Sequence, residues 1–176
     1  MGLMIFTVDK ILLLGVLIVA VITDIRSNRI PNWLTFSAII MGLGLNLISA
    51  GASGLLFSIE GLFLGGGLFL ILYVFGGMGA GDVKLMGAVG AMLGPKMVLM
   101  AALYTAIIGG IYALAVIFFH PRAETTRKNT IETIKSLIYF SNLKYNKTEV
   151  ADNPPKLCYG VAIALGTIIA VVMPAI

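Results

Sequence analysis

Long runs of apolar residues dominate the pattern along this chain, and short polar connectors separate them. A hydrocarbon core about 30 Å thick requires roughly 20 apolar residues in each spanning helix. The runs are apolar on every side, without a polar stripe at the helical period, which favours membrane helices over the amphipathic helices of a soluble protein. The pattern predicts about six transmembrane helices, at Leu3–Ile22, Trp33–Ile48, Leu55–Phe75, Val83–Leu93, Met97–Phe119 and Tyr159–Val172.

The fourth segment, Val83–Leu93, is too short to cross a membrane unaided. We expect that its helix includes flanking residues at its ends, or that the bilayer is thinner around it. The prediction is an all-α, polytopic membrane protein in which residues 1–176 form a single membrane-embedded domain. No basic region precedes the first apolar run, and no small-residue cleavage site follows Val21. We therefore expect the first segment to remain in the mature protein.

One long polar stretch, at about residues 120–156, separates the fifth and sixth segments. Within it, apolar residues recur at helical spacing opposite charged ones, at Ile131, Ile134, Leu137 and Ile138. This spacing fits a short basic amphipathic helix on anionic lipid, and it fits a solvated connector equally well.

Composition agrees with lipid as the solvent, because 59% of the residues are hydrophobic and only 11% are charged. Cys158 is the single cysteine and His120 the single histidine, so the chain has no internal disulfide, no CxxC pair and no histidine-rich metal centre. Carboxylate ligation of a metal is not excluded by residue counts. We expect no cofactor, no metal and no nucleic-acid partner, and we expect Cys158 to pack in the core.

The basic residues predict the orientation, because short cytoplasmic loops of membrane proteins collect Lys and Arg. If the N-terminus lies outside, only Lys10 and Lys96 remain on the outer side. We therefore predict a multi-pass protein of the cell inner (plasma) membrane with the long polar stretch in the cytoplasm. The cytoplasmic basic residues are then Arg26, Arg29, Lys84, Arg122, Arg127, Lys128, Lys135, Lys144, Lys147 and Lys156.

The first polar connector, residues 23–32, contains an aspartate that a structural role explains poorly. Asp24 lies at the C-terminal end of a predicted helix, where the helix dipole disfavours a negative charge. The structural alternative is a salt bridge to Arg26 or Arg29. In the same connector, Asn28 or Asn32 is suited to capping the following helix, and proline suits its first turn.

A glycine-rich segment, residues 76–84, leads into the fourth predicted helix and contains Asp82. Its glycines allow close backbone approach and positive φ angles. Taken alone, Asp82 fits a helix N-cap. A phosphate-binding loop is a poor alternative, because no strand precedes the glycines and the Lys-Ser/Thr pair of that motif is missing.

The predicted topology places Asp24 and Asp82 at the same membrane face and at similar depth, where ionisable groups are costly unless they function. Two neighbouring carboxylates cannot both ionise freely, so they share a proton. An aspartyl peptidase needs this state, in which one carboxylate takes a proton from water while the other donates one to the scissile carbonyl. We predict Asp24 and Asp82 as catalytic residues.

Residues 79–82, Gly-Ala-Gly-Asp, resemble the GxGD signature of intramembrane-type aspartyl proteases. Asp24 followed by residues 29–32, Arg-Ile-Pro-Asn, resembles the first aspartate motif of type IV prepilin peptidases, and residues 155–160 resemble the family's entrance to a final helix. The GxGD motif alone is weak, but the paired motifs and the six-span layout together are specific. Presenilin-like proteases share GxGD but carry a different first motif.

The resemblance implies cleavage of the leader peptide from type IV prepilin-like or Flp-type pilin precursors at the cytoplasmic face of the membrane. Larger family members add an N-terminal region with two CxxC pairs that is linked to methylation. That region is absent here, so the resemblance implies a peptidase without N-methyltransferase activity. Gly79 and Gly81 are expected to shape the loop and let the substrate backbone approach.

The rival hypothesis is a small ion-coupled membrane transporter that uses the same aspartates to bind a cation or relay protons. Its weakness is that transport sites tend towards the membrane midplane, whereas both aspartates lie at helix ends. Other polar and small residues have simpler expected roles. Lys84 is expected to extend to the membrane interface, and glycines at 61, 65, 87 and 90 to serve helix packing.

Overall fold

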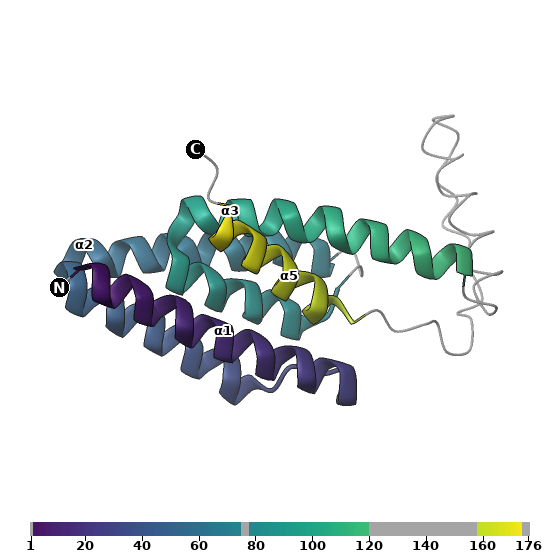
Figure 1. Cartoon of the computed structure of the whole chain (residues 1–176), viewed down its shortest axis with the longest axis horizontal. Helices are drawn as coiled ribbons and strands as arrows, with labels where there is room; N and C mark the ends of the chain where they lie inside the picture. The colour runs from purple at the N-terminus through teal and green to yellow at the C-terminus, as the bar shows by residue number, and fades with distance from the viewer. Residues whose placement is uncertain (1, 75–77, 120–157, 174–176) are drawn as a thin grey trace. The chain divides into compact units, whose positions relative to one another are not determined.

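A computed structural model describes residues 2–74, 78–119 and 158–173, with side chains from Val8 onward and, in the third helix, as far as Ala115. These residues form four helices, labelled α1 (Gly2–Ser27), α2 (Asn32–Val74), α3 (Ala80–Phe119) and α5 (Tyr159–Val172) (Figure 1). The predicted all-α class is confirmed for the described part of the chain. The predicted count of six separate helices is not confirmed.

Two of the four helices, α2 and α3, contain a sharp bend at a glycine. Gly51 has a φ of 63° and Gly94 a φ of 78°, values in the left-handed region that glycine adopts without a steric penalty. At the first bend the chain folds back on itself. This brings the hydroxyl of Ser58 close enough to donate a hydrogen bond of 3.3 Å to the carbonyl of Gly42, 16 residues earlier. Both bends fall in connectors that the apolar pattern predicted, so the six expected segments correspond to straight parts of these four helices.

Contacts divide the chain into two compact units, Met1–Gly109 with Cys158–Ile176, and Gly110–Leu157. The first unit contains every predicted site residue. The second is described only at the end of α3. The predicted amphipathic helix around Ile131–Ile138 lies outside the described residues, and the prediction of one domain over residues 1–176 stays a prediction.

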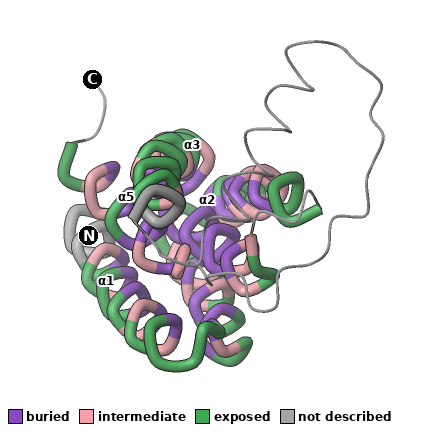
Figure 2. Tube along the Cα trace, turned by 90° about the vertical axis from the view of Figure 1, so that its right-hand side faces the viewer, coloured by how far each residue is buried: buried purple, intermediate pink, exposed green. Residues whose placement is uncertain are grey.

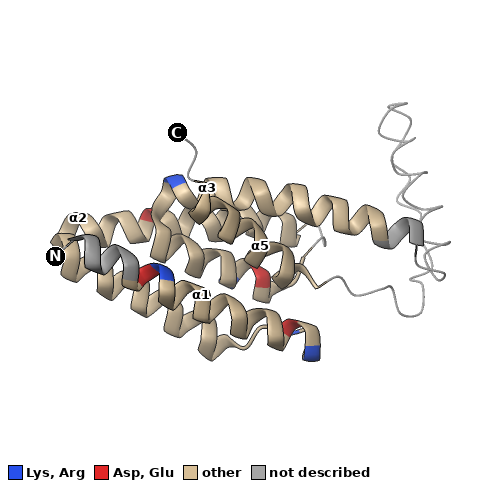
Figure 3. Cartoon of the chain, viewed as in Figure 1, with Lys and Arg blue, Asp and Glu red and all other residues tan. Residues whose placement is uncertain are grey.

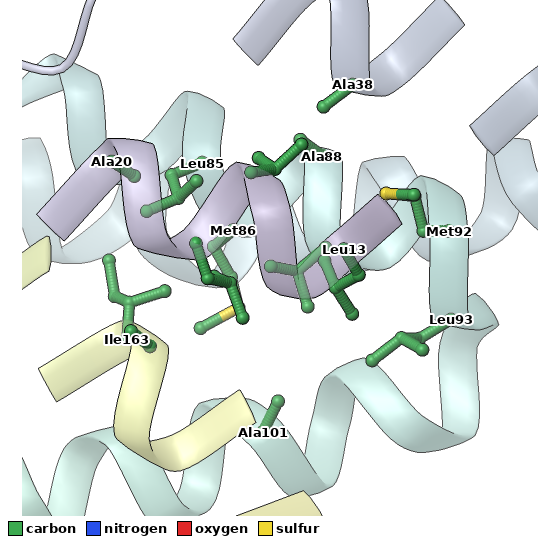
Figure 4. Close-up of a cluster of buried hydrophobic side chains, with 14 of the residues drawn as sticks. Leu13, Ala20, Ala38, Leu85, Met86, Ala88, Met92, Leu93, Ala101 and Ile163 are labelled. Carbon is green, nitrogen blue, oxygen red and sulfur yellow. The ribbon is translucent and has the colours of Figure 1, made fainter. Parts of the chain in front are cut away.

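The core of the first unit lies where α1, α3 and α5 meet. Leu13 and Leu17 of α1, Leu85 and Met86 of α3, and Ile163 of α5 are each at most 2% exposed. Figure 4 shows side chains of this cluster converging from the three helices, and Figure 2 shows buried positions on the helix sides that face one another. Packing of apolar residues from segments far apart in sequence therefore holds the ends of these helices in place.

A glycine seam, formed by Gly42, Gly61, Gly65, Gly87 and Gly90, joins α2 to the first part of α3. A Cβ atom added to Gly61 would collide with the carbonyl oxygen of Gly90, and one added to Gly90 would collide with that of Gly61. A Cβ at Gly42 would lie 2.8 Å from the carbonyl carbon of Ala91. The helix backbones are thus in direct contact, which confirms the predicted packing role of these glycines.

Large apolar side chains cover the outer faces of the helices. Ile48, Phe63 and Val74 are 75%, 73% and 74% exposed, and Figure 3 shows few charged positions along the described helices. By length and composition, α2 and residues Ala80–Ala115 of α3 are suited to crossing a membrane. These surfaces fit a lipid environment, in which exposed apolar side chains carry no hydration penalty.

Candidate active site

Asp24 lies in the last turn of α1, with 6% of its surface exposed. The backbone N–H of Gly160, at the start of α5, donates a hydrogen bond of 2.9 Å to Oδ2 of Asp24. The backbone N–H of Asn28 donates to the carbonyl oxygen of Asp24 at 2.8 Å, and Asn28 itself ends the helix with a φ of 50°. The contact with Gly160 joins residues that are 136 positions apart in the sequence.

This contact explains why an acidic residue is tolerated at the C-terminal end of α1. The first N–H groups of a helix have no partner within the helix itself, and its N-terminus carries a partial positive charge. Its N-cap residue, Cys158, makes no capping hydrogen bond with its side chain. Asp24 supplies an acceptor from another helix, so the dipole of α5 offsets the unfavourable dipole of α1.

Asp82 lies in the first turn of α3 and is 7% exposed. Its Oδ2 accepts a hydrogen bond of 3.0 Å from the N–H of Gly79, and its own N–H donates to the carbonyl of Gly79 at 3.1 Å. The first bond is the half of a capping box in which the third helical residue reaches back to the residue before the helix. The second bond is a backbone turn, because Gly79 has no side chain to complete the box. Asp82 is therefore not the N-cap itself, because α3 begins at Ala80.

The two aspartates line one cleft, with a volume of about 770 Å³. Gly79 and Gly81, the two predicted loop-shaping glycines, line it as well. A Cβ at Gly81 would lie 3.1 Å from the Cβ of Ile30, so the start of α3 packs closely against the connector between α1 and α2. The remaining lining residues are Thr23, Ser27, Asn28, Arg29, Ile30, Pro31, Asn32, Trp33 and Ala80.

Several neighbouring side chains differ from the sequence expectations. The amide oxygen of Asn28 accepts the thiol of Cys158 at an S···O distance of 3.7 Å, and that of Asn32 accepts the ammonium of Lys84 at 2.8 Å. These oxygens are engaged away from the start of α2, so the predicted capping roles of both asparagines are wrong. Cys158 lies half-buried beside the cleft and not in the core. Lys84 is bound to Asn32, and its expected reach to the membrane interface stays a prediction.

Gly160 is the residue that the sequence analysis missed. A Cβ at this position would lie 2.8 Å from Oδ2 of Asp24 and 3.1 Å from its Cβ, so only glycine allows this approach without movement of the carboxylate. The available signal was a glycine at the start of the last helix, on the membrane face where both aspartates were predicted. That signal was too general to single out Gly160.

The donor set offers little for a metal ion. In the part of the chain that the structure describes, no cluster of three or more His, Cys, Asp or Glu side chains could hold one. The cleft holds two aspartates and backbone N–H donors, a set suited to proton transfer and to binding a polar group such as a peptide carbonyl.

The model of the type IV leader peptidase family matches residues 11–114. The chain belongs to this family. A relative in Bacillus subtilis (strain 168), the "Prepilin leader peptidase/N-methyltransferase", is 32% identical over 111 residues, which are 61% of this chain and 44% of that protein. The chain thus matches less than half of that curated relative. No solved structure matches it.

The matched region includes Asp24 and residues 79–82, the motifs on which the resemblance to prepilin peptidases rests. Membership of a peptidase family does not favour the transporter hypothesis. Gly160 lies outside the matched region, so its contact with Asp24 is information that only the structure provides.

Proposed function

We propose that this protein is an aspartic-type prepilin leader peptidase, in which Asp24 and Asp82 are the catalytic residues. The observation that carries the proposal is that both carboxylates, which come from different helices, line one cleft. Each is held through Oδ2 by a backbone N–H near the start of a helix, Asp24 by Gly160 and Asp82 by Gly79. We expect Oδ1 of each to face the reacting water and peptide.

Hydrolysis then follows acid–base chemistry. One carboxylate removes a proton from a water molecule, whose oxygen attacks the scissile carbonyl carbon, while the protonated partner donates its proton to the carbonyl oxygen. Collapse of the tetrahedral intermediate breaks the C–N bond and transfers a proton to the leaving amine. Gly79 leaves room for the substrate backbone, because it lines the cleft without a side chain. Gly81 shapes the loop, because its missing Cβ lets the start of α3 pack against Ile30.

The proposed substrates are type IV prepilin-like or Flp-type pilin precursors, which we place at the cytoplasmic face of the inner membrane. The abundance of Lys and Arg in the connectors on the Asp24 side supports this orientation. We propose a multi-pass protein embedded in membrane lipids and, as the resemblance implies, a peptidase without N-methyltransferase activity.

The test compares leader cleavage by purified wild type, Asp24→Asn and Asp82→Asn in detergent, using a pilin precursor and a gel shift. Each change removes a proton-transfer group, so we expect cleavage to fall at least about 100-fold. Asp9→Asn is the matched control, because Asp9 is also a buried aspartate of α1, 8% exposed, but does not line the cleft.

Normal cleavage by both cleft variants would overturn the catalytic assignment. The orientation has a separate test, in which Asn28→Cys is labelled with a membrane-impermeant maleimide in a Cys158→Ser background. Labelling from the cytoplasmic side alone is expected, and labelling from the periplasmic side alone contradicts the proposed topology. Transfer of a methyl group to the cleaved product would contradict the peptidase-only assignment.

A further inference from the structure

Lys84 lies two residues after Asp82 in α3, and its side chain leaves the cleft. Two positions along a helix correspond to a rotation of about 200°, so Lys84 and Asp82 project in nearly opposite directions. The ammonium of Lys84 instead reaches the start of α2, where it donates the 2.8 Å hydrogen bond to Oδ1 of Asn32. It also lies 5.7 Å from the centroid of the Phe36 ring.

These two contacts hold the ammonium on one face of α2. Asn32 and Phe36 are four residues apart, so they lie one above the other on the helix surface. A cation is disfavoured at a helix N-terminus by the dipole, which means that the location of Lys84 requires these specific partners. The charge-assisted hydrogen bond and the cation–π contact supply them.

The bond connects the two parts of the chain that carry the aspartates. On one side, the connector that follows Asp24 is tied to it by the N–H of Asn28 and ends at Asn32. On the other side, Lys84 belongs to the same first turns of α3 as Asp82. The close approach of Gly81 to Ile30 is the second contact between these segments.

We propose that Lys84 is a positioning residue of the active site, which holds the first turns of α3 at a fixed distance from the connector through its bond to Asn32. The inference rests on the proposed function, because a fixed distance matters only if both carboxylates act on one water molecule. Lys84 itself does not line the cleft, and its ammonium contacts Asn32 and Phe36. Its loss should lower kcat and leave KM nearly unchanged, since the cleft lining that binds substrate remains.

The experiment measures kcat and KM for leader cleavage by Lys84→Met, Lys84→Arg, Asn32→Ala and the double variant Lys84→Met/Asn32→Ala. We expect Lys84→Met and Asn32→Ala each to lower kcat about 10- to 100-fold, the range expected for small misplacements of catalytic groups. Because both remove the same bond, the double variant should be no slower than the slower single variant. Lys84→Arg should recover most of the activity, because the N–H groups of arginine can reach Asn32 and its planar guanidinium can stack on Phe36.

Lys96→Met is the matched control, since Lys96 is an exposed lysine of α3 that does not line the cleft. Its kcat should equal that of wild type. Thermal unfolding in detergent identifies any variant that fails to fold. If Lys84→Met fails to fold, Asn32→Ala carries the test through kcat and the spin-label distances, because it removes the same bond from an exposed side chain. Its KM is not part of the test, since Asn32 also lines the cleft.

A second measurement does not depend on activity. Spin labels at exposed positions 26 and 80, in a Cys158→Ser background, report the distance between the end of α1 and the start of α3. The distribution should broaden in Lys84→Met and Asn32→Ala, and remain as in wild type in Lys96→Met. An unchanged distribution, a wild-type kcat in Lys84→Met, or independent losses that multiply in the double variant would each overturn the proposal.

These outcomes separate the two hypotheses. If Asp24→Asn and Asp82→Asn are inactive while Lys84→Met has wild-type kcat, only the positioning role is lost. If both aspartate variants cleave normally, the proposed chemistry is lost, and the spin-label distances still decide whether Lys84 holds the two segments together.

Discussion

Glycines meet a neighbouring segment at close range in two regions of this molecule, the glycine seam between α2 and α3 and the cleft that holds the two aspartates. In the seam, Gly61 and Gly90 bring two helix backbones into contact, and the atoms nearest to each missing Cβ are backbone atoms. At the cleft, Gly79 in the lining and Gly160 behind Asp24 each present a backbone N–H to a carboxylate oxygen. The same missing Cβ thus supports packing in one region and the placement of an acidic group in the other.

The comparison teaches that the two regions should respond differently to the smallest possible side chain. An added methyl group in the seam pushes two backbones apart, which lowers the free energy of unfolding. An added methyl group in the cleft displaces a carboxylate, which lowers the rate of catalysis. Alanine substitutions can therefore separate stability from activity.

The largest effect is expected in the seam, from Gly61→Ala. The new Cβ would overlap the carbonyl oxygen of Gly90, and a backbone atom cannot rotate away as a side chain does. Overpacking a well-packed interior costs about 1 to 3 kcal/mol, and this site belongs at or above the upper end. We expect a large drop in the unfolding midpoint measured in detergent, with normal activity in any fraction that remains folded.

Gly67→Ala is the control for that change. Gly67 lies in the same helix, and a Cβ there would have no neighbour within 4 Å. Its unfolding midpoint should equal or slightly exceed that of wild type, because alanine favours helix over glycine. Equal midpoints in Gly61→Ala and Gly67→Ala would show that the seam is not packed as described.

Next in size is Gly160→Ala at the cleft. The new Cβ would lie 2.8 Å from Oδ2 of Asp24, so the carboxylate must move away from the N–H that holds it. A displacement of about 1 Å at a catalytic group can cost on the order of 100-fold in rate, and we expect kcat for leader cleavage to fall by about that factor. The unfolding midpoint should change much less than in Gly61→Ala.

Gly15→Ala provides the comparison on α1, the helix that carries Asp24. A Cβ at Gly15 would meet nothing within 4 Å, so both kcat and the unfolding midpoint should stay near wild type. A Gly160→Ala variant with full activity would mean that Asp24 does not need the N–H of Gly160. The distinction between the two regions would then disappear.

The sequence predicted the helical segments well because their signal is local. The last helix, Tyr159–Val172, has the predicted bounds, and the bends at Gly51 and Gly94 fall between predicted segments. The first helix extends beyond Ile22 to Ser27, since the hydroxyls of Thr23 and Ser27 bond to carbonyls one turn earlier and keep polar residues inside the helix. A prediction from apolar residues alone therefore ends such a helix too early.

The location of the two aspartates could be predicted from charge and topology. The contacts that hold the site together could not, because they depend on how the helices pack. That Asp24 and Asp82 line one cleft was predictable, because each is acidic at a helix end on the same predicted membrane face. Their catalytic role stays a prediction. The contact between Asp24 and Gly160 depends on how α1 and α5 pack, and the contact between Lys84 and Asn32 depends on how α3 and α2 pack. No local spacing encodes either. Asn32 shows the limit, because its sequence position suits a helix cap while its side chain binds Lys84 from another helix.

The smallest expected effect concerns Cys158, whose thiol reports the charge in the cleft. Burial raises the pKa of this thiol, and the negative charges of Asp24 and Asp82 raise it further. A raised pKa keeps the thiol protonated to higher pH, and only the thiolate reacts with iodoacetamide. In Asp24→Asn/Asp82→Asn two of the three causes are removed, so the midpoint of the alkylation rate should move to lower pH.

Asp9 lies on α1 outside the cleft and is not among the charges that raise the pKa of Cys158, so Asp9→Asn should leave the midpoint unchanged. The measurement is the alkylation rate of Cys158, the only cysteine, from neutral to alkaline pH in folded protein. A midpoint that is the same in wild type and in the double variant would mean that the two carboxylates carry no charge near Cys158. The cleft would then differ from the seam only in its shape. The claim that glycines at the cleft place charged carboxylates would fail.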